Sequence, residues 1–451
     1  MKIKRIVSLT LSLVMLMLCS GCSLNFFSVE SLMSPPSQSG KNGEVEKNFK
    51  KLMSDKTVQL RTPASGDYQT AYILYDINGD GNEEAFVFYT DSSVDASVRM
   101  AFLECINGTW VISADVKGGG SSVYDVSFAD LNNDGLSEVL VSWSLFESKT
   151  SRILSIYKIR SGSNGVFTLN TLDTMGNEYF NAKAVVDFNG DGKKDIALIN
   201  LDDSSDVQKS FFRCFSLNDS DELVKFAETK IDSSITTVSN IQCDTVKTDN
   251  GETARVFIDC LKTDSAMFTE MLYWNSSKLT AVRAVNNPSV TTLRNSKVIC
   301  RDIDGDGVLE IPVNTKLNGT DANLTAKVDK VNYTFTMLKW INSTGDKSEG
   351  NIYTLYNPID SYLYRVTRFS DITVKYDALR EALLICLWDD NKKVIKEELL
   401  SVSYKEKGDD AEKLNELIRE EKGAFYYNIT DYGKNFGITD EGVKSSFIII
   451  E

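Results

Sequence analysis

The stretch Asp76-Ile-Asn-Gly-Asp-Gly-Asn-Glu-Glu84 is one of four similar acidic segments in this chain of 451 residues. Each segment has oxygen-bearing side chains at positions 1, 3, 5 and 9 and a glycine at position 6, and an apolar β-type run comes after it. Calcium takes about six to eight oxygen ligands, and a tight turn containing glycine brings several carboxylates together. We refer to the segments as the first to fourth acidic loops, and the other three are Asp130-Leu-Asn-Asn-Asp-Gly-Leu-Ser-Glu138, Asp187-Phe-Asn-Gly-Asp-Gly-Lys-Lys-Asp195 and Asp302-Ile-Asp-Gly-Asp-Gly-Val-Leu-Glu310.

The spacing of the loops indicates a repeat. Their first residues lie 54, 57 and 115 positions apart, and because 115 is close to twice 57, we expect a further unit near residue 245. The segment Val246–Gly251 keeps the glycine, but Val246 and Ala254 stand at positions 1 and 9, so it lacks the full ligand set. Each unit has about four short β-type runs, and such sheets bury both faces only by stacking. We predict an all-β fold, a five-bladed β-propeller over residues 45–349 that Gln59–Arg61 closes into a ring.

Two other families of acidic loop are excluded by the residues after position 9. An EF-hand needs a bidentate glutamate at position 12 and then a helix, and dockerin repeats also continue into helices. Position 12 is apolar in all four loops and lies inside a β-type run: Val87, Val141, Leu198 and Val313. The units instead resemble FG-GAP/VCBS repeats, the calcium-loop blades of integrin α-chain propellers and of many bacterial surface proteins. The resemblance covers roughly residues 67–345.

The resemblance implies that each loop joins the first and second strands of a blade and that the chain binds up to four Ca²⁺ ions. The position-7 residues would contribute backbone carbonyls: Asn82, Leu136, Lys193 and Val308. The side-chain ligands implied are Asp76, Asn78, Asp80 and Glu84; Asp130, Asn132, Asp134 and Glu138; Asp187, Asn189, Asp191 and Asp195; and Asp302, Asp304, Asp306 and Glu310. The alternative is a tight hairpin that uses Asp, Asn and Gly only for turn chemistry. That alternative explains the glycines but not the convergent carboxylates, which repel one another unless a cation lies among them.

The sequence of the N-terminal segment predicts that the protein is exported. Lys2, Lys4 and Arg5 precede an apolar run over residues 6–18, and Cys19-Ser-Gly-Cys22 comes next. This is the order of regions in a signal peptide, and the small residues before Cys22 resemble a bacterial lipobox. We expect a signal peptide over residues 1–22, lipid on Cys22, a flexible tether over residues 23–44 and a location on the outer face of a bacterial membrane. The alternative is an ordinary signal peptide with a chance cysteine. The whole chain is similar to repeat-bearing bacterial lipoproteins.

Composition excludes several function classes. The formal net charge of −15 argues against nucleic acid as a partner. The chain has no histidine, which removes Ser-His and Cys-His catalytic pairs and histidine-ligated zinc. Six cysteines lie beyond Cys22 without metal-binding spacing, and buried free thiols are favoured over disulfides.

After residue 350 the repeat stops, and the sequence predicts a small α+β domain over residues 350–451. Residues 372–376, 382–388 and 399–404 are typical of strands. An apolar stripe behind Asp410 predicts a helix that ends at Gly423, and a further strand is expected over residues 424–428.

These features favour a non-catalytic, calcium-binding scaffold at the cell surface, in which the metal role is structural and the ligand is an unknown protein or glycan. Docking of another envelope protein is one form of this hypothesis. The alternative is a carboxylate-based carbohydrate-active enzyme, a glycosidase or lyase, because that chemistry needs no histidine. No catalytic residue is assigned, since the recognisable acids belong to the loops.

Overall fold

The computed structural model describes residues 40–93, 95–145, 148–161, 167–174, 179–202, 209–248, 251–263, 266–317, 324–328, 330–341, 352–407 and 414–450. The expected signal peptide, its Cys22 and most of the expected tether lie outside these ranges. Helix α3 (Lys41–Leu52) begins inside the last residues of that tether. Its sequence is mostly charged and polar, but it contains an apolar pair, Val45 and Phe49, at the i, i+4 spacing of one helix face.

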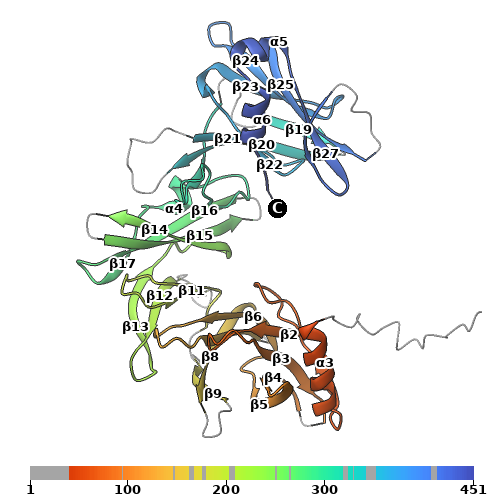
Figure 1. Ribbon diagram of the computed structural model, residues 1–451. Coiled ribbons are helices and arrows are strands. Elements are labelled where there is room, and N and C mark those ends of the chain that lie inside the picture. The colour runs from red at the N-terminus through yellow and green to blue at the C-terminus, as the bar shows by residue number, and fades with distance from the viewer. Residues whose placement is uncertain are drawn as a thin grey trace, which may run out of the picture.

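The described chain is almost entirely β, in six antiparallel sheets that succeed one another in sequence (Figure 1). The first sheet contains β1 (Val58–Leu60), β2 (Tyr72–Tyr75), β3 (Glu84–Asp91), β4 (Asp95–Ile106) and β5 (Thr109–Lys117). The second contains β6 (Ser122–Ala129), β7 (Glu138–Leu145), β8 (Ser148–Ser161) and β9 (Phe167–Thr174). The third contains β10 (Ala182–Val186), β11 (Asp195–Asp202), β12 (Lys209–Leu217) and β13 (Leu223–Lys230).

The remaining three sheets occupy the second half of the chain. The fourth contains β14 (Thr237–Thr248), β15 (Gly251–Thr263), β16 (Ala266–Asn275) and β17 (Thr280–Arg283). The fifth contains β18 (Ile311–Asn314), β19 (Leu324–Val328), β20 (Val331–Ile341), β21 (Ile352–Asn357), β22 (Tyr362–Arg365) and β28 (Phe447–Ile449). The sixth contains β23 (Ile372–Asp377), β24 (Ala382–Asp389), β25 (Val394–Glu406), β26 (Asn415–Arg419) and β27 (Gly423–Ile429). Short helices α4 (Pro288–Thr291), η1 (Phe369–Asp371), α5 (Asp431–Phe436) and α6 (Asp440–Ser446) connect these strands.

In the first four sheets the second strand is buried on both faces over most of its length, which explains why these strands read as unbroken apolar runs. All eight residues of β3 are buried. Successive side chains of a strand point to opposite faces. Phe86 and Phe88 therefore pack into the core shared with the second sheet, while Val87 and Tyr89 pack on the other face against α3. The same alternation in β7 and β15 joins each sheet to the next and gives a propeller-like stack.

The outer face of the first sheet is covered by α3. The ring of Phe49 lies edge-on against Tyr72 and Tyr89, with ring centroids 6.1 and 5.5 Å apart. In Figure 1 the first sheet and α3 lie at one end of the molecule and the fifth and sixth sheets at the other. In a closed ring, the last blade would pack against the outer face of the first sheet. Among the described residues, helix α3 occupies that face instead.

The prediction that Gln59–Arg61 closes the ring is wrong. Strand β1 pairs with β3 of the first sheet, where Leu60 lies opposite Tyr89. Strand β2 pairs with the beginning of β3 and β1 with its end, so both occupy the same edge of one strand. The backbone groups at the end of β3 therefore obtain their partners locally.

The C-terminal region differs from the expectation in two respects. The expected boundary at residue 350 falls between β20 and β21, which are hydrogen-bonded neighbours in the fifth sheet, and β28 returns to the same sheet. The predicted helix behind Asp410 is also wrong: its described part contains the strand β26, which pairs with β27. The free edge of β27 needs backbone partners, and this demand overrides a helical apolar spacing. The strands predicted over residues 372–376, 382–388, 399–404 and 424–428 are confirmed.

Among the described helices, none combines the length and apolarity of a transmembrane span. The six described cysteines are free thiols, and four of them are buried: Cys214, Cys260, Cys300 and Cys386.

Candidate metal centres

Each acidic loop lies between the first and second strands of a sheet. The first three loops come directly after β2, β6 and β10, and their position-9 residue is the first residue of β3, β7 or β11. In the fifth sheet the first strand is reduced to a single bridge, Arg301 with Glu310, and the fourth loop lies inside that bridge. Position 9 therefore enters the protein core as a fixed consequence of the strand pairing.

All four loops share one hydrogen-bond frame around position 1. In the first loop, Asp76 accepts the N–H of Asp80 on Oδ1 at 3.1 Å and the N–H of Gly81 on Oδ2 at 2.9 Å. The corresponding distances are 3.2 and 2.9 Å in the second loop, 3.2 and 2.9 Å in the third, and 3.1 and 2.8 Å in the fourth. Gly81 has φ +86°, and position 6 has nearly the same value in every loop, a conformation that favours glycine.

The position-9 carboxylates are buried: Glu84 is 6% exposed, Glu138 0%, Asp195 0% and Glu310 5%. Each accepts one N–H from position 2, at 2.8 to 3.1 Å. The other carboxylate oxygen of Glu138 and of Asp195 has no hydrogen-bond partner in the structure. A buried carboxylate oxygen without a partner is unfavourable, so these atoms fit a site that a cation completes.

The electrostatics of the position-9 groups agree with that conclusion. Burial, helped by the carboxylates of Asp191 and Asp187, raises the pKa of Asp195 to about 7 against the lowering effect of two backbone N–H groups. The pKa values of Glu84, Glu138 and Glu310 are also raised to about 7, with burial as the largest cause and the carboxylates of the same loop adding to it. Each loop thus concentrates negative charge that its own N–H groups do not compensate.

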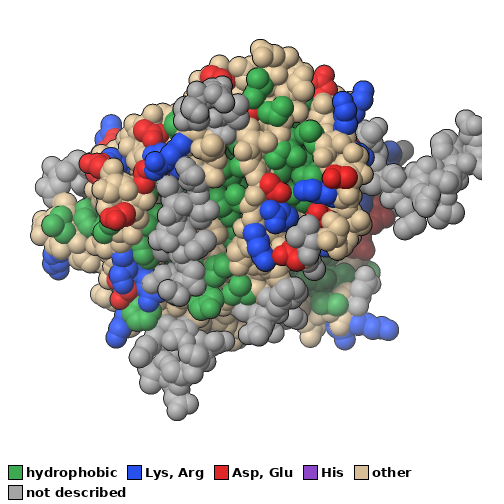
Figure 2. Space-filling model, turned by 90° about the horizontal axis from the view of Figure 1, so that it is seen from below, with side chains coloured by type: hydrophobic (Ala, Val, Ile, Leu, Met, Phe, Trp, Pro, Cys, Tyr) green, Lys and Arg blue, Asp and Glu red, His purple; other side chains and the backbone are tan. Residues whose placement is uncertain are grey.

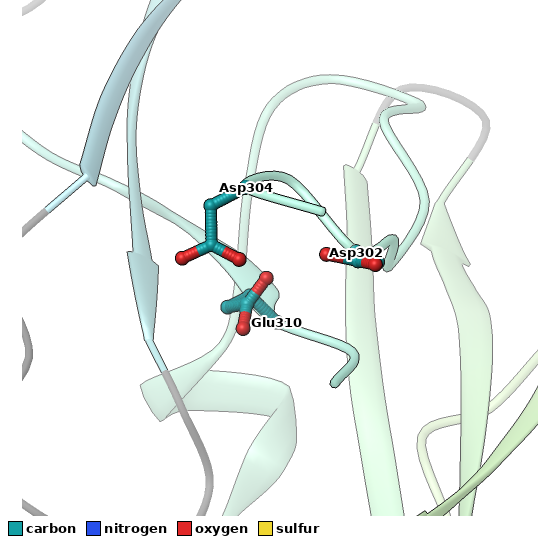
Figure 3. Close-up of side chains that lie close together, drawn as sticks. All are labelled: Asp302, Asp304 and Glu310. Atoms are coloured by element: carbon teal, nitrogen blue, oxygen red, sulfur yellow. The ribbon is translucent and has the colours of Figure 1, made fainter. Parts of the chain in front are cut away.

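The fourth loop brings three of its predicted ligands together most closely. Carboxylate oxygens of Asp302, Asp304 and Glu310 lie within 4.8 Å of one another, and Figure 3 shows Asp304 and Glu310 turned toward each other with Asp302 beside them. In the other three loops position 3 is asparagine, whose amide donates to the position-5 carboxylate. The position-7 residues are held by an N–H that donates to position 5 at 2.7 to 2.9 Å.

One residue of the second loop's surroundings was missed by sequence reasoning. The ammonium of Lys158, on β8, lies 2.9 Å from Asp134 Oδ2 and 4.0 Å from Glu138 Oε1. Both carboxylates belong to the predicted ligand set. The sequence feature that could have indicated this contact is the lysine itself: it lies inside the apolar run Leu154–Ile159, at a position where a strand residue points inward.

Strands of the second, third and fourth sheets, together with residues 65–67 ahead of β2, border a polar cavity of about 610 Å³, which no sequence pattern indicated. Its lining includes Arg152, whose guanidinium carbon lies 3.4 Å from the centre of the Tyr124 ring. Lys183 and Asp125 form an ion pair on the same wall. On the face shown in Figure 2, acidic and basic side chains are mixed with apolar ones.

Comparisons with known proteins identify one region. Residues 63–141 match the model of the FG-GAP-like repeat family. No curated protein matches the chain. The solved structures matched, all at low similarity, include a levansucrase variant from B. megaterium, with 9% identity and TM-score 0.26 over 69% of this chain and 82% of the other. They also include a periplasmic gluconolactonase from Pseudomonas aeruginosa, with 10% identity and TM-score 0.26 over 77% and 95%. A third is an exo-β-1,3-galactanase from Phanerochaete chrysosporium, with 8% identity and TM-score 0.27 over 88% and 92%. The matched region runs from ahead of β2 into β7 and contains the first two acidic loops, so the chain contains FG-GAP-like repeat sequence in a propeller-like, all-β fold.

Proposed function

We propose that this protein is an exported, calcium-binding lipoprotein that acts as a non-catalytic binding scaffold on the outer face of a bacterial membrane. The observation that carries the proposal is the recurrence of one loop frame four times, each with a buried carboxylate at position 9. The repeat-bearing sheets, the first to the fifth, would be the five blades.

The donor set favours calcium among biological cations. The loops offer carboxylate and amide oxygens at positions 1, 3, 5 and 9 and a backbone carbonyl at position 7, with no sulfur or imidazole in the set. Hard cations prefer such oxygens, and calcium tolerates the irregular geometry of a flexible loop better than magnesium does. A cation bound there would supply the positive charge that the position-9 carboxylate lacks.

The proposed role of the metal is structural. A bound ion would tie the loop to the first residue of a strand that is buried on both faces, and it would remove the penalty of the buried carboxylate. When free calcium is about tenfold above the dissociation constant, each site contributes roughly 1.4 kcal/mol of stability. Three or four such sites would contribute about 4–6 kcal/mol, which is comparable to the net stability of a typical domain.

The cavity bordered by Arg152, Tyr124 and Lys183 is the place at which the scaffold would bind a polar ligand such as a glycan. The same cavity favours the alternative, a glycosidase or lyase, because the carboxylates of Asp67 and Asp125 both line it. Asp125, however, accepts hydrogen bonds from Lys183 and Ser142. Both bonds are made to Oδ1, so this oxygen is already engaged by side chains of the protein. Binding without turnover is therefore favoured.

Thermal unfolding of the purified chain tests the calcium role. With saturating calcium we expect a melting temperature on the order of 10 °C above that in EDTA, because a few kcal/mol shift the midpoint by several degrees each in a large domain. Equal midpoints with and without EDTA would contradict it.

The anchor is tested separately: Cys22→Ala should move the protein from the membrane fraction to the soluble exported fraction.

A further inference from the structure

The second acidic loop already holds a positive charge that belongs to the protein. Lys158 projects from β8 with only 9% of its side chain exposed, and its ammonium lies 2.9 Å from Asp134 Oδ2. The same ammonium lies 4.0 Å from Glu138 Oε1, the buried oxygen that has no hydrogen-bond partner. The ammonium of Lys158 therefore lies beside the carboxylates of both position 5 and position 9 of this loop.

The sheet register explains why this lysine reaches the loop. Val139 pairs with Tyr157 across β7 and β8, so the next residues outward, Glu138 and Lys158, lie opposite each other. The same register in the first sheet sets Glu104 opposite position 9, and in the third sheet it sets Ser216 there. Among these three sheets, only the second has a cationic side chain at this position.

A third carboxylate fixes the ammonium from the neighbouring sheet. Asp221, in the turn between β12 and β13 of the third sheet, lies 2.8 Å from Lys158 Nζ. Asp221 also accepts Arg160 Nη2 at 2.7 Å. Lys158 thus joins the second loop to the third sheet without a metal ion.

We propose that Lys158 takes the cation position of the second loop, so that calcium binds at the first, third and fourth loops and the second is a metal-independent link between sheets. The inference rests on the proposed calcium role of the loops. An ammonium 2.9 Å from the position-5 carboxylate and 4.0 Å from the position-9 carboxylate repels a divalent cation and blocks its approach to the oxygens of both groups. In the third loop, the matching Ser216 leaves those oxygens to the metal.

Equilibrium dialysis of the purified full chain against calcium, with metal and protein quantified, tests the proposal. We expect three ions per wild-type chain and four per Lys158→Met chain, because methionine keeps the length of the side chain and removes its charge. Lys396→Met is the control: this lysine lies on β25 of the sixth sheet, which carries no acidic loop, and its ammonium pairs with Asp389 at 3.3 Å. The control chain should still bind three ions.

A second pair of variants keeps the proposal testable if Lys158→Met does not fold. Asp134→Asn and Asp191→Asn change the same position-5 ligand in the second and third loops. We expect three ions in Asp134→Asn and two in Asp191→Asn. Four ions in the wild type, or the loss of one ion in both variants, would overturn the lysine assignment and leave the calcium role intact. A wild-type chain that binds no calcium would instead overturn the proposed function itself.

Discussion

The fourth sheet and the sheets that carry acidic loops make the same strand-to-strand connection in two different ways. In the fourth sheet β14 runs directly into a hairpin with β15, and position 9 is the buried Ala254. In the other sheets a nine-residue loop places a buried carboxylate there. The fold therefore forms without the acidic loop, and turn chemistry alone does not explain why four units retain it.

The two kinds of sheet also differ in where positive charge comes from. The fourth sheet pairs its buried carboxylates with guanidinium groups of the protein: Asp244 with Arg255 of the same sheet, and Asp259 with Arg294, which follows α4. Both Asp259 and Arg294 are 0% exposed. In the first, third and fourth loops the structure shows no protein cation within ion-pair distance of the position-9 carboxylate among the described residues. We infer that a metal ion and a buried arginine are two solutions to the same electrostatic problem.

The largest effect should come from Asp259→Ala in the fourth sheet. Asp259 accepts Arg294 Nη2 at 2.8 Å, Thr269 Oγ1 at 2.7 Å and the N–H of Cys300 at 3.0 Å. Removing it leaves a buried guanidinium without its counter-charge, which costs about 3–5 kcal/mol. Urea unfolding should show the same loss in calcium and in EDTA. If calcium restored the lost stability, the distinction between the two kinds of sheet would be wrong.

Ala254→Asp should destabilise the protein by about 2–4 kcal/mol, because it buries a carboxylate at position 9 of a unit that lacks the rest of the ligand set. Since position 1 of that unit is Val246, calcium should not rescue the variant. The measurement is the unfolding midpoint at several calcium concentrations, with Ala254→Val as a control for the added volume. Rescue of the aspartate variant by calcium would mean that the loop is not needed to build a site.

Asp195→Asn should have opposite effects in the two conditions. With calcium it removes a ligand, so we expect a loss of about 1–2 kcal/mol. In EDTA it removes an uncompensated buried carboxylate, so stability should stay equal or rise. Asp219→Asn, an exposed neighbour, is the control and should change neither value. A loss of equal size in both conditions would point to a packing role for Asp195.

The smallest effect, counted per group and per pH unit, is the pH dependence of the metal-free protein. The pKa values of the four position-9 carboxylates are about 7 in the folded chain, above their ordinary values of 4.5 for Glu and 3.8 for Asp. The folded state then holds more protons than the unfolded state in this window. Stability in EDTA should fall as pH rises from about 5 to about 7, by at most about 1.4 kcal/mol per pH unit for each group.

The calcium-induced gain should show the opposite trend, because calcium needs the ionised carboxylates. It should be larger at pH 7.5 than at pH 5.5, and calcium binding near pH 6.5 should release protons. Asp195→Asn should flatten the pH profile in EDTA. A profile that is unchanged by this variant would remove Asp195 from the titrating groups.

The sequence alone predicted the features that depend on local pattern. The spacing of the loops predicted the repeated sheets, including the fourth, where Val246–Gly251 is a decayed copy. The resemblance to FG-GAP/VCBS repeats implied that each loop lies between the first and second strands, as the strand order has it. These features repeat along the chain, so each copy supports the others.

The features that sequence reasoning missed depend on contacts between distant segments. The segment Gln59–Arg61 lies along β3 of its own sheet because that edge is free, and β26 is a strand because β27 needs a partner. Lys158 is placed by a cross-strand register, and its second partner Asp221 lies 63 residues further along the chain. Helix α3 was hidden by its high charge, although Val45 and Phe49 have helical spacing.

Metal binding at the loops is tested most directly by a crystal structure of the chain grown in calcium, with anomalous scattering used to locate the ions. We predict an ion in the first, third and fourth loops, each coordinated by the oxygens of positions 1, 3, 5, 7 and 9. We also predict the ammonium of Lys158 in the second loop. Loops that keep their hydrogen-bond frame in saturating calcium but contain no ion would contradict the proposed metal role.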